Sequence, residues 1–161
     1  MKEHTCCFTG HRHLPKSEIG LIIKRLNDEI ENLYRGGVTN FISGGALGFD
    51  QIAASLIAAK KEMGYAIRLI FILPCKDQDS GWTSEQKRLY RDLLARADEI
   101  RYASETYRSD CLKTRNARLV EESGYCIAYL TRPRSGTAQT VRLAKARGLV
   151  VLSLTAGPPS P

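Results

Sequence analysis

Hydrophobic and polar residues along this chain alternate between short apolar runs and longer stretches in which apolar residues recur every three or four positions. Runs of the first kind predict buried strands, and stretches of the second kind predict helices with one apolar face. The predicted strands cover residues 5–9, 38–43, 66–73, 99–103, 125–130 and 149–154. The predicted helices cover residues 17–35, 48–64, 111–123 and 136–147, and a further helix begins after a capping-box sequence at residues 83–86.

The spacing also predicts which residues each helix buries. The helix over 17–35 is followed by a Gly-Gly pair that ends it, and its apolar face consists of Ile19, Ile22, Ile23, Leu26, Ile30 and Leu33. The helix over 48–64 is expected to bury Ile52, Leu56, Ala59 and Met63. The helix after residue 83 is expected to bury Leu89, Tyr90, Leu93 and Leu94. The strand over 66–73 is apolar on both faces and is expected to end at Pro74.

The order of these elements predicts the fold class. Strands and helices alternate along the chain, which indicates βαβ units with right-handed crossovers. We therefore expect an α/β fold of three layers, with a mostly parallel central sheet and helices on both of its faces. Residues 1–154 are expected to form a single domain, and the Pro-, Gly- and Ser-containing residues 155–161 a flexible C-terminal tail.

Length and composition limit the number of domains and the cellular compartment that we expect. A length of 161 residues suits one domain with its own core. No stretch approaches the roughly 20 apolar residues of a membrane span, and residues 1–4 carry no hydrophobic signal, so we expect a cytoplasmic protein without a membrane partner. The five cysteines form no Cys-x-x-Cys pair, which favours reduced thiols. Cys6 and Cys7 point to opposite faces of a strand, and no metal site is predicted.

Charge is distributed unevenly along the chain. Lys and Arg number 24 against 17 Asp and Glu, a formal net charge of +7, and the excess is concentrated between Arg108 and Arg147. A basic half of this kind suits a polyanion or a phosphate-bearing ligand. The alternative is a solvated surface without a partner, and charge alone does not decide between the two.

Three glycine-containing turns carry the strongest chemical signal. They are Thr9-Gly10-His11-Arg12, Ser43-Gly44-Gly45-Ala46-Leu47-Gly48-Phe49-Asp50 and Ser135-Gly136-Thr137, and each follows a predicted strand. Because the carboxyl ends of parallel strands meet at one edge of a sheet, we expect the three turns to lie at that edge. Backbone amides at such turns, helped by the partial positive charge of a helix N-terminus, bind anions, most naturally the phosphate of a nucleotide.

Side chains near these turns complete the predicted site. Arg12 and Arg115 could hold a phosphate, and Asp50 could accept hydrogen bonds from a ribose. The predicted ligand-binding residues from the turns and their neighbours are Gly10, His11, Arg12, Ser43, Gly44, Gly45, Gly48, Asp50, Arg115, Asn116, Ser135, Gly136 and Thr137.

Each candidate also has a structural interpretation. Glycines serve tight turns and close helix packing, and Asp50 and Ser135 are ordinary residues for a helix N-terminus. The Arg-Asn pair at 115–116 could lie on a solvated helix face. Gln78, Trp82 and Tyr90 could form a lid that stacks on a base, or Trp82 could belong to the core. The residues alone leave these alternatives open.

Taken in order, the motifs resemble the YpsA-type proteins of unknown function, and the likeness covers nearly the whole chain. Those proteins belong to the SLOG superfamily, together with the cytokinin-activating LOG phosphoribohydrolases and the DNA-processing protein DprA. The resemblance implies a Rossmann-like sheet and a glycine-lined pocket for a nucleotide or an ADP-ribose-like molecule. It also implies a homo-oligomer, because SLOG relatives often self-associate, and it adds Thr140 to the pocket.

One departure from the relatives bears on catalysis. LOG enzymes carry Pro-Gly-Gly-x-Gly-Thr-x-x-Glu, whose glutamate assists cleavage of an N-glycosidic bond, and the corresponding position here is Thr140. A threonine hydroxyl has no acid–base pKa near neutrality. The leading hypothesis is therefore a module that binds AMP, NAD or an ADP-ribose-like ligand and requires no cofactor. The alternatives are a nucleotide hydrolase that uses Asp50 and Arg115 and, less favoured, a DprA-like protein that binds single-stranded DNA.

Overall fold

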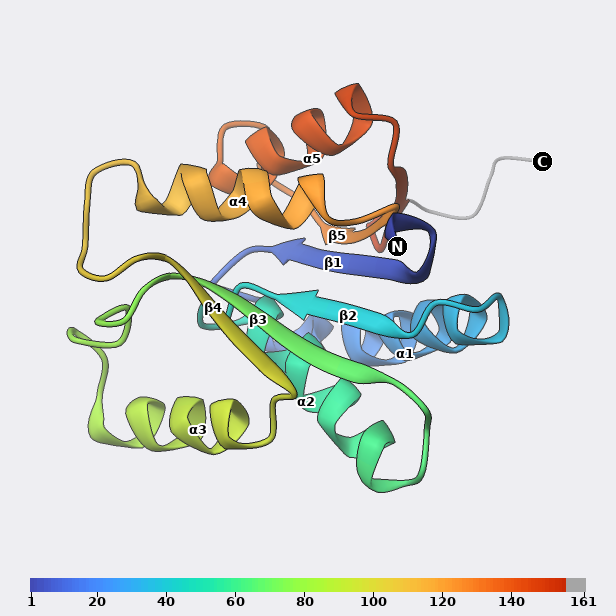
Figure 1. Ribbon diagram of the computed structural model, residues 1–161, viewed down its shortest axis with the longest axis horizontal. Helices are drawn as coiled ribbons and strands as arrows, with labels where there is room; N and C mark the ends of the chain where they lie inside the picture. The colour runs from blue at the N-terminus through green and yellow to red at the C-terminus, as the bar shows by residue number, and fades with distance from the viewer. Residues whose placement is uncertain (156–161) are drawn as a thin grey trace.

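The computed structural model of the protein describes residues 1–155 (Figure 1). Its strands are β1 (Thr5–Gly10), β2 (Asn40–Ser43), β3 (Arg68–Cys75), β4 (Glu99–Ser104), β5 (Tyr125–Tyr129) and β6 (Val150–Ser153). Its α-helices are α1 (Ile19–Arg35), α2 (Phe49–Glu62), α3 (Ser84–Ala95), α4 (Cys111–Glu121) and α5 (Gly136–Ala146). Short 3₁₀ turns at Lys2–His4 and Lys16–Glu18 precede β1 and α1. No helix within the described residues has the length and apolar character needed to cross a membrane.

The strands form one parallel sheet in the order β4-β3-β2-β1-β5-β6. Helices α4 and α5 cover one face of the sheet, and α1, α2 and α3 lie on the other (Figure 1). The chain therefore leaves the neighbouring strands β1 and β5 toward opposite faces. A crevice at their carboxyl ends follows from this reversal. The three-layer α/β fold predicted from the sequence is confirmed, and every strand pair is parallel.

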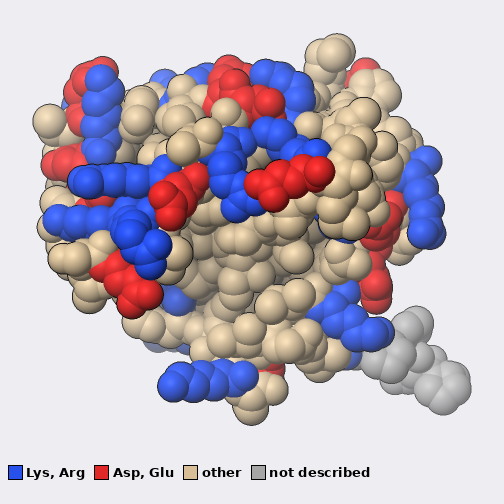
Figure 2. All heavy atoms as spheres, turned by 90° about the horizontal axis from the view of Figure 1, so that it is seen from below, with Lys and Arg blue, Asp and Glu red and all other residues tan. Residues whose placement is uncertain are grey.

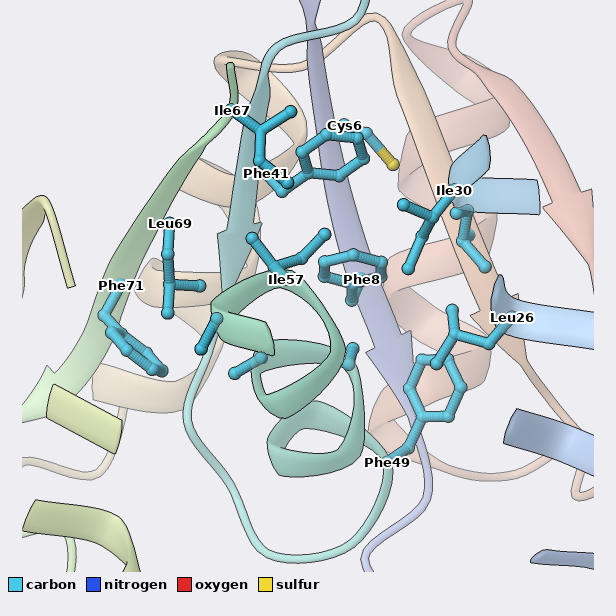
Figure 3. Packing of buried hydrophobic residues seen from close by; sticks show 14 of the residues in the cluster. Cys6, Phe8, Leu26, Ile30, Phe41, Phe49, Ile57, Ile67, Leu69 and Phe71 are labelled. Atoms are coloured by element: carbon cyan, nitrogen blue, oxygen red, sulfur yellow. The ribbon is translucent and has the colours of Figure 1, made fainter. Parts of the chain in front are cut away.

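Two apolar clusters, one on each face of the sheet, form the core. Cys6 and Phe8 of β1 belong to the cluster with α1 and α2, whereas Cys7 belongs to the cluster with α4 and α5. Figure 3 shows Phe8 and Phe41 of the sheet beside Ile57 of α2. The rings of Phe8 and Phe41 stack with centroids 6.0 Å apart. The opposite orientation predicted for the two adjacent cysteines is confirmed.

Strand β3 continues beyond its predicted end. The sequence predicts that Pro74 stops it, but the strand runs to Cys75. β3 pairs with β2 only between Arg68 and Phe71, and its later residues pair with β4 alone. At Pro74 the strand therefore has one free edge, where a residue without an N–H is tolerated.

Helix α2 turns a different face to the core than the spacing predicts. Its buried apolar residues are Phe49, Ala53, Ala54, Ile57 and Ala58. Ala59 and Met63 are exposed, and Ile52 and Leu56 are only partly buried. Leu89 of α3, also predicted to be buried, is 46% exposed, and Ile23 of α1, predicted to lie on the apolar face of its helix, is 36% exposed. Helix α2 packs on the sheet through the face that carries three alanines, because small side chains let a helix approach a sheet closely.

The C-terminal tail predicted over 155–161 lies outside the described residues, apart from Thr155. The Thr155 hydroxyl donates a hydrogen bond to the backbone oxygen of Leu130 at 3.0 Å. Arg25 of α1 donates one to the backbone oxygen of Leu154 at 2.8 Å. These two bonds fix the end of the described chain beside β5 and α1.

Candidate anion-binding site

A cavity of about 320 Å³ opens at the carboxyl end of β1, where the strand order reverses toward β5. The end of β1 with the following loop, the helix α4 and the start of α5 form its walls. Parallel α/β sheets bind their ligands in this crevice. The predicted residues that line it are Gly10, His11, Arg12, Asp50, Arg115, Asn116, Ser135, Gly136 and Thr137.

The remaining predicted residues do not line this cavity; they are Ser43, Gly44, Gly45, Gly48 and Thr140. The Gly45 amide donates to the Ser43 hydroxyl at 3.2 Å, and the Ala46 amide donates to Asp50 Oδ2 at 3.4 Å. Side chains of the turn therefore occupy amides that the sequence assigns to a phosphate. The Asp50 carboxylate lies where an external anion is expected.

Two glycines of this turn are explained by close approaches within the protein. A side chain at Gly44 would overlap the guanidinium of Arg115, and one at Gly48 would overlap the backbone of Arg12. Gly48 also has a φ of 81°, in the left-handed region that favours glycine. For Gly44 and Gly48, the structural interpretation accounts for the residue without a ligand.

Arg115 of α4 is the central cation of the cavity. It is 5% exposed; its Nη1 donates to the Gly44 backbone oxygen at 2.6 Å, and its Nε donates to Asn116 Oδ1 at 2.7 Å. No carboxylate within residues 1–155 forms an ion pair with it inside 4.0 Å. Burial lowers the pKa of Arg115, and the nearby charge of Asp50 opposes this only in part. A buried guanidinium with incomplete charge compensation favours an anionic ligand.

Asp50 lies in the first turn of α2 and is 6% exposed. Burial raises the pKa of its carboxyl to about 6, although Arg115, the Ala46 amide and Arg12 each act to lower it. The carboxyl therefore changes its charge close to neutral pH, and the cavity is more positive below pH 6 than above it.

The N-terminus of α5 contributes backbone donors. Ser135 caps the helix, as the structural interpretation predicts, because its hydroxyl accepts a hydrogen bond from the Ala138 amide at 3.1 Å. The amides of Gly136 and Thr137 have no acceptor among residues 1–155, and both residues line the cavity. A methyl group added at Gly136 would meet no atom within 4 Å, and its φ does not require glycine. Contacts within the described protein thus give no reason for a glycine at this position.

His11 has a structural role that the motifs did not reveal. It is 3% exposed, and its Nε2 accepts hydrogen bonds from the amides of Thr131 at 2.9 Å and Arg132 at 3.4 Å. Burial and the charge of Arg132 lower the pKa of His11, which favours the neutral ring that these bonds need. His11 thereby fixes the loop that leads from β5 to Ser135.

Thr140 and the proposed lid residues lie away from the cavity. The Thr140 hydroxyl donates to the Gly136 backbone oxygen at 3.0 Å, so it is engaged within its own helix. Trp82 packs edge-on against Tyr90 with ring centroids 4.9 Å apart, and Gln78 Nε2 donates to the Tyr90 hydroxyl at 3.0 Å. Trp82 contacts the core cluster, as its structural interpretation predicts.

Arg132 lines the cavity, although the motifs did not single it out as a site residue. It lies in the loop between β5 and α5, and it adds a third arginine to Arg12 and Arg115. Its place three residues before the capping Ser135 is the signal that could have identified it. No group of three His, Cys, Asp or Glu side chains suited to a metal occurs within the part of the chain that the structure describes.

Comparison with known proteins settles the family. A family model described as the YspA SLOG family, YpsA, matches residues 6–146, from β1 to the end of α5. The chain belongs to the YpsA-type SLOG family. The resemblance inferred from the order of the motifs is thereby confirmed.

Two curated relatives are similar to this YpsA-type chain, and the name of the first describes it as uncharacterised. The SPbeta prophage-derived protein YoqJ of Bacillus subtilis (strain 168) is 32% identical over 127 residues, which cover 71% of each chain. The UPF0398 protein BH1768 of Halalkalibacterium halodurans is 27% identical over 149 residues, 91% of this chain and 77% of the relative.

Solved structures of DNA processing protein A (DprA) share the fold of this YpsA-type protein. DprA from Streptococcus pneumoniae aligns with a TM-score of 0.66 at 18% identity, over 92% of this chain and 49% of its own. DprA from Helicobacter pylori, described for its single-stranded DNA binding mode, aligns with a TM-score of 0.66 at 18% identity, over 94% of this chain and 65% of its own. The YpsA-type chain thus spans about half the length of the Streptococcus pneumoniae DprA. At 18% identity, the similarity to both DprA structures shows a shared fold alone.

Proposed function

We propose that this YpsA-type protein binds a nucleotide or a nucleotide-derived ligand, such as AMP, NAD or ADP-ribose, through its phosphate. The observation that carries the proposal is the start of α5, where the amides of Gly136 and Thr137 lack an acceptor within residues 1–155 and open onto the cavity of the buried Arg115. Arg12 and Arg132 add two cations to the same walls. Helix N-terminal amides together with arginines are a favourable setting for a phosphate.

Cavity volume limits how much of such a ligand is enclosed. At about 320 Å³ the cavity lies at the lower end of the range for small-molecule sites. A phosphate with its ribose suits this space, whereas a whole dinucleotide needs more. We therefore expect the phosphate–ribose end to be enclosed and the base to lie outside.

Replacing Gly136 by alanine tests the proposal. The added methyl would meet no protein atom within 4 Å, so the variant should be at least as stable as the wild type, but the methyl adds bulk at a residue that lines the cavity, where a phosphate would approach the α5 amides. A ligand at about 100 times its Kd adds about 2.7 kcal/mol to the free energy of unfolding. In thermal-shift titrations with AMP, NAD and ADP-ribose, the wild type should gain several degrees for at least one ligand, and Gly136→Ala much less.

A matched control comes from α1. A methyl at Gly20 likewise meets no atom within 4 Å, and Gly20 does not line the cavity, so Gly20→Ala should keep the full thermal shift. The proposal fails if none of the three ligands shifts the wild type, or if Gly136→Ala responds as strongly as Gly20→Ala.

Single-stranded DNA binding is a second candidate function. The Helicobacter pylori DprA structure concerns that protein's single-stranded DNA binding. Several exposed cations on the side of α4 and α5 form no ion pair within 4.0 Å among residues 1–155, and a surface of this kind suits a polyanion. They are Lys113, Arg118, Arg132, Arg134, Arg142, Lys145 and Arg147.

Hydrolysis of an N-glycosidic bond is favoured by one observation on Asp50. Its carboxyl lines the cavity and, with a pKa of about 6, is available in protonated form below that pH. Such a group can donate a proton to a leaving base. Incubation of the protein with AMP should then release adenine, and Asp50→Asn should abolish the release. Complete recovery of AMP after several hours would exclude this activity for AMP.

A further inference from the structure

A groove of about 800 Å³ lies between α1, α2 and α3, in the helix layer opposite α4 and α5. Aliphatic side chains from all three helices form its walls, namely Ile19, Ile23, Ile52, Leu56, Leu89 and Leu93. Ile23 is 36% exposed and Leu89 is 46% exposed. Figure 2, which views the molecule from the side of α2 and α3, shows a broad area without charged side chains that Lys, Arg, Asp and Glu border. Exposed apolar patches rimmed by charge are typical of interaction surfaces.

The border of the groove is positively charged on one side. Arg12 and Lys16 line it and form no ion pair within 4.0 Å among the described residues. The other charged lining residues are engaged elsewhere: Arg96 lies 2.6 Å from Glu62, and Asp92 lies 3.8 Å from an arginine of its own helix. The uncompensated charge next to the apolar walls is therefore cationic, and it is complementary to acidic side chains.

The shape of the groove narrows the choice of occupant. Two copies of the chain that faced each other through this concave surface would leave a void between them, so the groove is not complementary to itself. Among the described residues that line the groove, His13 is the one with an aromatic ring on which a base could stack. A helix with an aliphatic face is convex and fills a groove between helices through side chains at i, i+3, i+4 and i+7.

We propose that the groove between α1, α2 and α3 binds an amphipathic helix of another protein. The helix would place aliphatic side chains against the groove walls and acidic side chains beside Arg12 and Lys16. Arg12 lines both the groove and the anion cavity, so of these two cations Lys16 is the one that belongs to the groove alone.

A synthetic helix tests the proposal. The probe is a fluorescein-labelled peptide of about four turns, with Leu at i, i+3, i+4 and i+7 spacing and Glu at the polar positions near one end. A control peptide carries Lys in place of Glu. We expect fluorescence polarisation to show micromolar binding of the acidic peptide and at least about tenfold weaker binding of the basic peptide. No saturable binding of the acidic peptide, or equal binding of both, overturns the proposal.

Substitutions in the protein locate the binding surface. Leu89→Glu places a charge on the groove wall at an exposed position, so the variant should fold normally and bind the acidic peptide at least about tenfold more weakly. Met63→Glu is the matched control, because Met63 is apolar, 74% exposed and outside the groove. Lys16→Glu should weaken binding of the acidic peptide and strengthen binding of the basic one.

Thermal melts of each variant establish that it is folded before binding is compared. The proposal is overturned if Leu89→Glu and Met63→Glu weaken binding of the acidic peptide equally. Sedimentation velocity provides the last check: if the wild type is a dimer that Leu89→Glu dissociates, the occupant is a second copy of the chain and the proposal is wrong.

Discussion

Asp50 gives the anion cavity a charge that depends on pH. Because burial raises its pKa to about 6, the carboxyl is mostly neutral at about pH 5 and ionised at about pH 8, and it repels an anion beside Arg115 only at the higher pH. The pyrophosphate of ADP-ribose keeps its charge over this range. We therefore expect ADP-ribose to bind at least about tenfold more tightly at the lower pH, measured by isothermal titration calorimetry.

Asp50→Asn provides the control for this pH dependence. The amide retains an acceptor for the Ala46 amide but does not titrate, so ADP-ribose should bind the variant with nearly the same affinity at both pH values. His11 also faces the cavity, and its pKa is lowered in the folded protein. If the variant kept the full pH dependence of the wild type, the effect would belong to His11 or another group, and the role given to Asp50 would be wrong.

The turn that begins α2 is held by contact between two chain segments. The Phe49 amide donates to the His11 backbone oxygen at 3.1 Å, and Gly48 lies against the backbone of Arg12. Gly48→Ala should lower the free energy of unfolding by at least about 2 kcal/mol, because it combines a φ of 81° with an overlap against backbone atoms. Gly64→Ala, at a φ of 98° with no atom within 4 Å, should cost only about 1 kcal/mol. If urea denaturation showed the same loss of unfolding free energy for both variants, the contact of Gly48 with the Arg12 backbone would not contribute to stability.

At the level of elements, the sequence predicts which segments form strands and helices, because this depends on local spacing. It does not predict which helix faces are buried where this depends on packing against other elements. The alternation of strands and helices, and with it the parallel sheet, follows from periodicity in each segment. The buried face of α2 does not, because it depends on how closely Ala53, Ala54 and Ala58 let the helix approach the sheet. Leu89 has the spacing of a core residue, but it lines the groove between three helices, and no pattern within α3 records that groove.

The whole-molecule arrangement explains which part of the candidate site could be predicted from the sequence. Topology alone brings the end of β1 and the start of α5 to one crevice, so strand-end turns were enough to predict that Gly10, Arg12 and Gly136 lie together at one cavity. Which backbone amides are free to bind a ligand could not be predicted in the same way. It depends on where the Ser43 hydroxyl and the Asp50 carboxylate lie in three dimensions. These two groups accept hydrogen bonds from amides of the longest glycine run, so those amides are not free.

The distribution of charge over the whole molecule makes the DNA-binding candidate testable. Each phosphate contact with single-stranded DNA contributes about 0.7 to the slope of log K against log salt concentration. Arg142 and Lys145 of α5 are exposed, so if DNA lies across this side, replacing both by alanine should reduce the slope by about 1.4 for a fluorescein-labelled oligo-dT. Arg35 of α1 and Arg91 of α3 are also exposed, and they lie in the opposite helix layer.

Alanine at those two control positions changes the net charge by the same amount and should leave the slope unaltered. An equal reduction for both pairs would mean that the oligonucleotide responds to total charge alone, because non-specific attraction does not depend on which face carries the cations. A wild type without detectable binding at about 50 mM salt would remove the candidate altogether, since electrostatic affinity is strongest there. Of the exposed cations around α4 and α5, Arg132 would then still line the cavity, and the others would belong to a solvated surface.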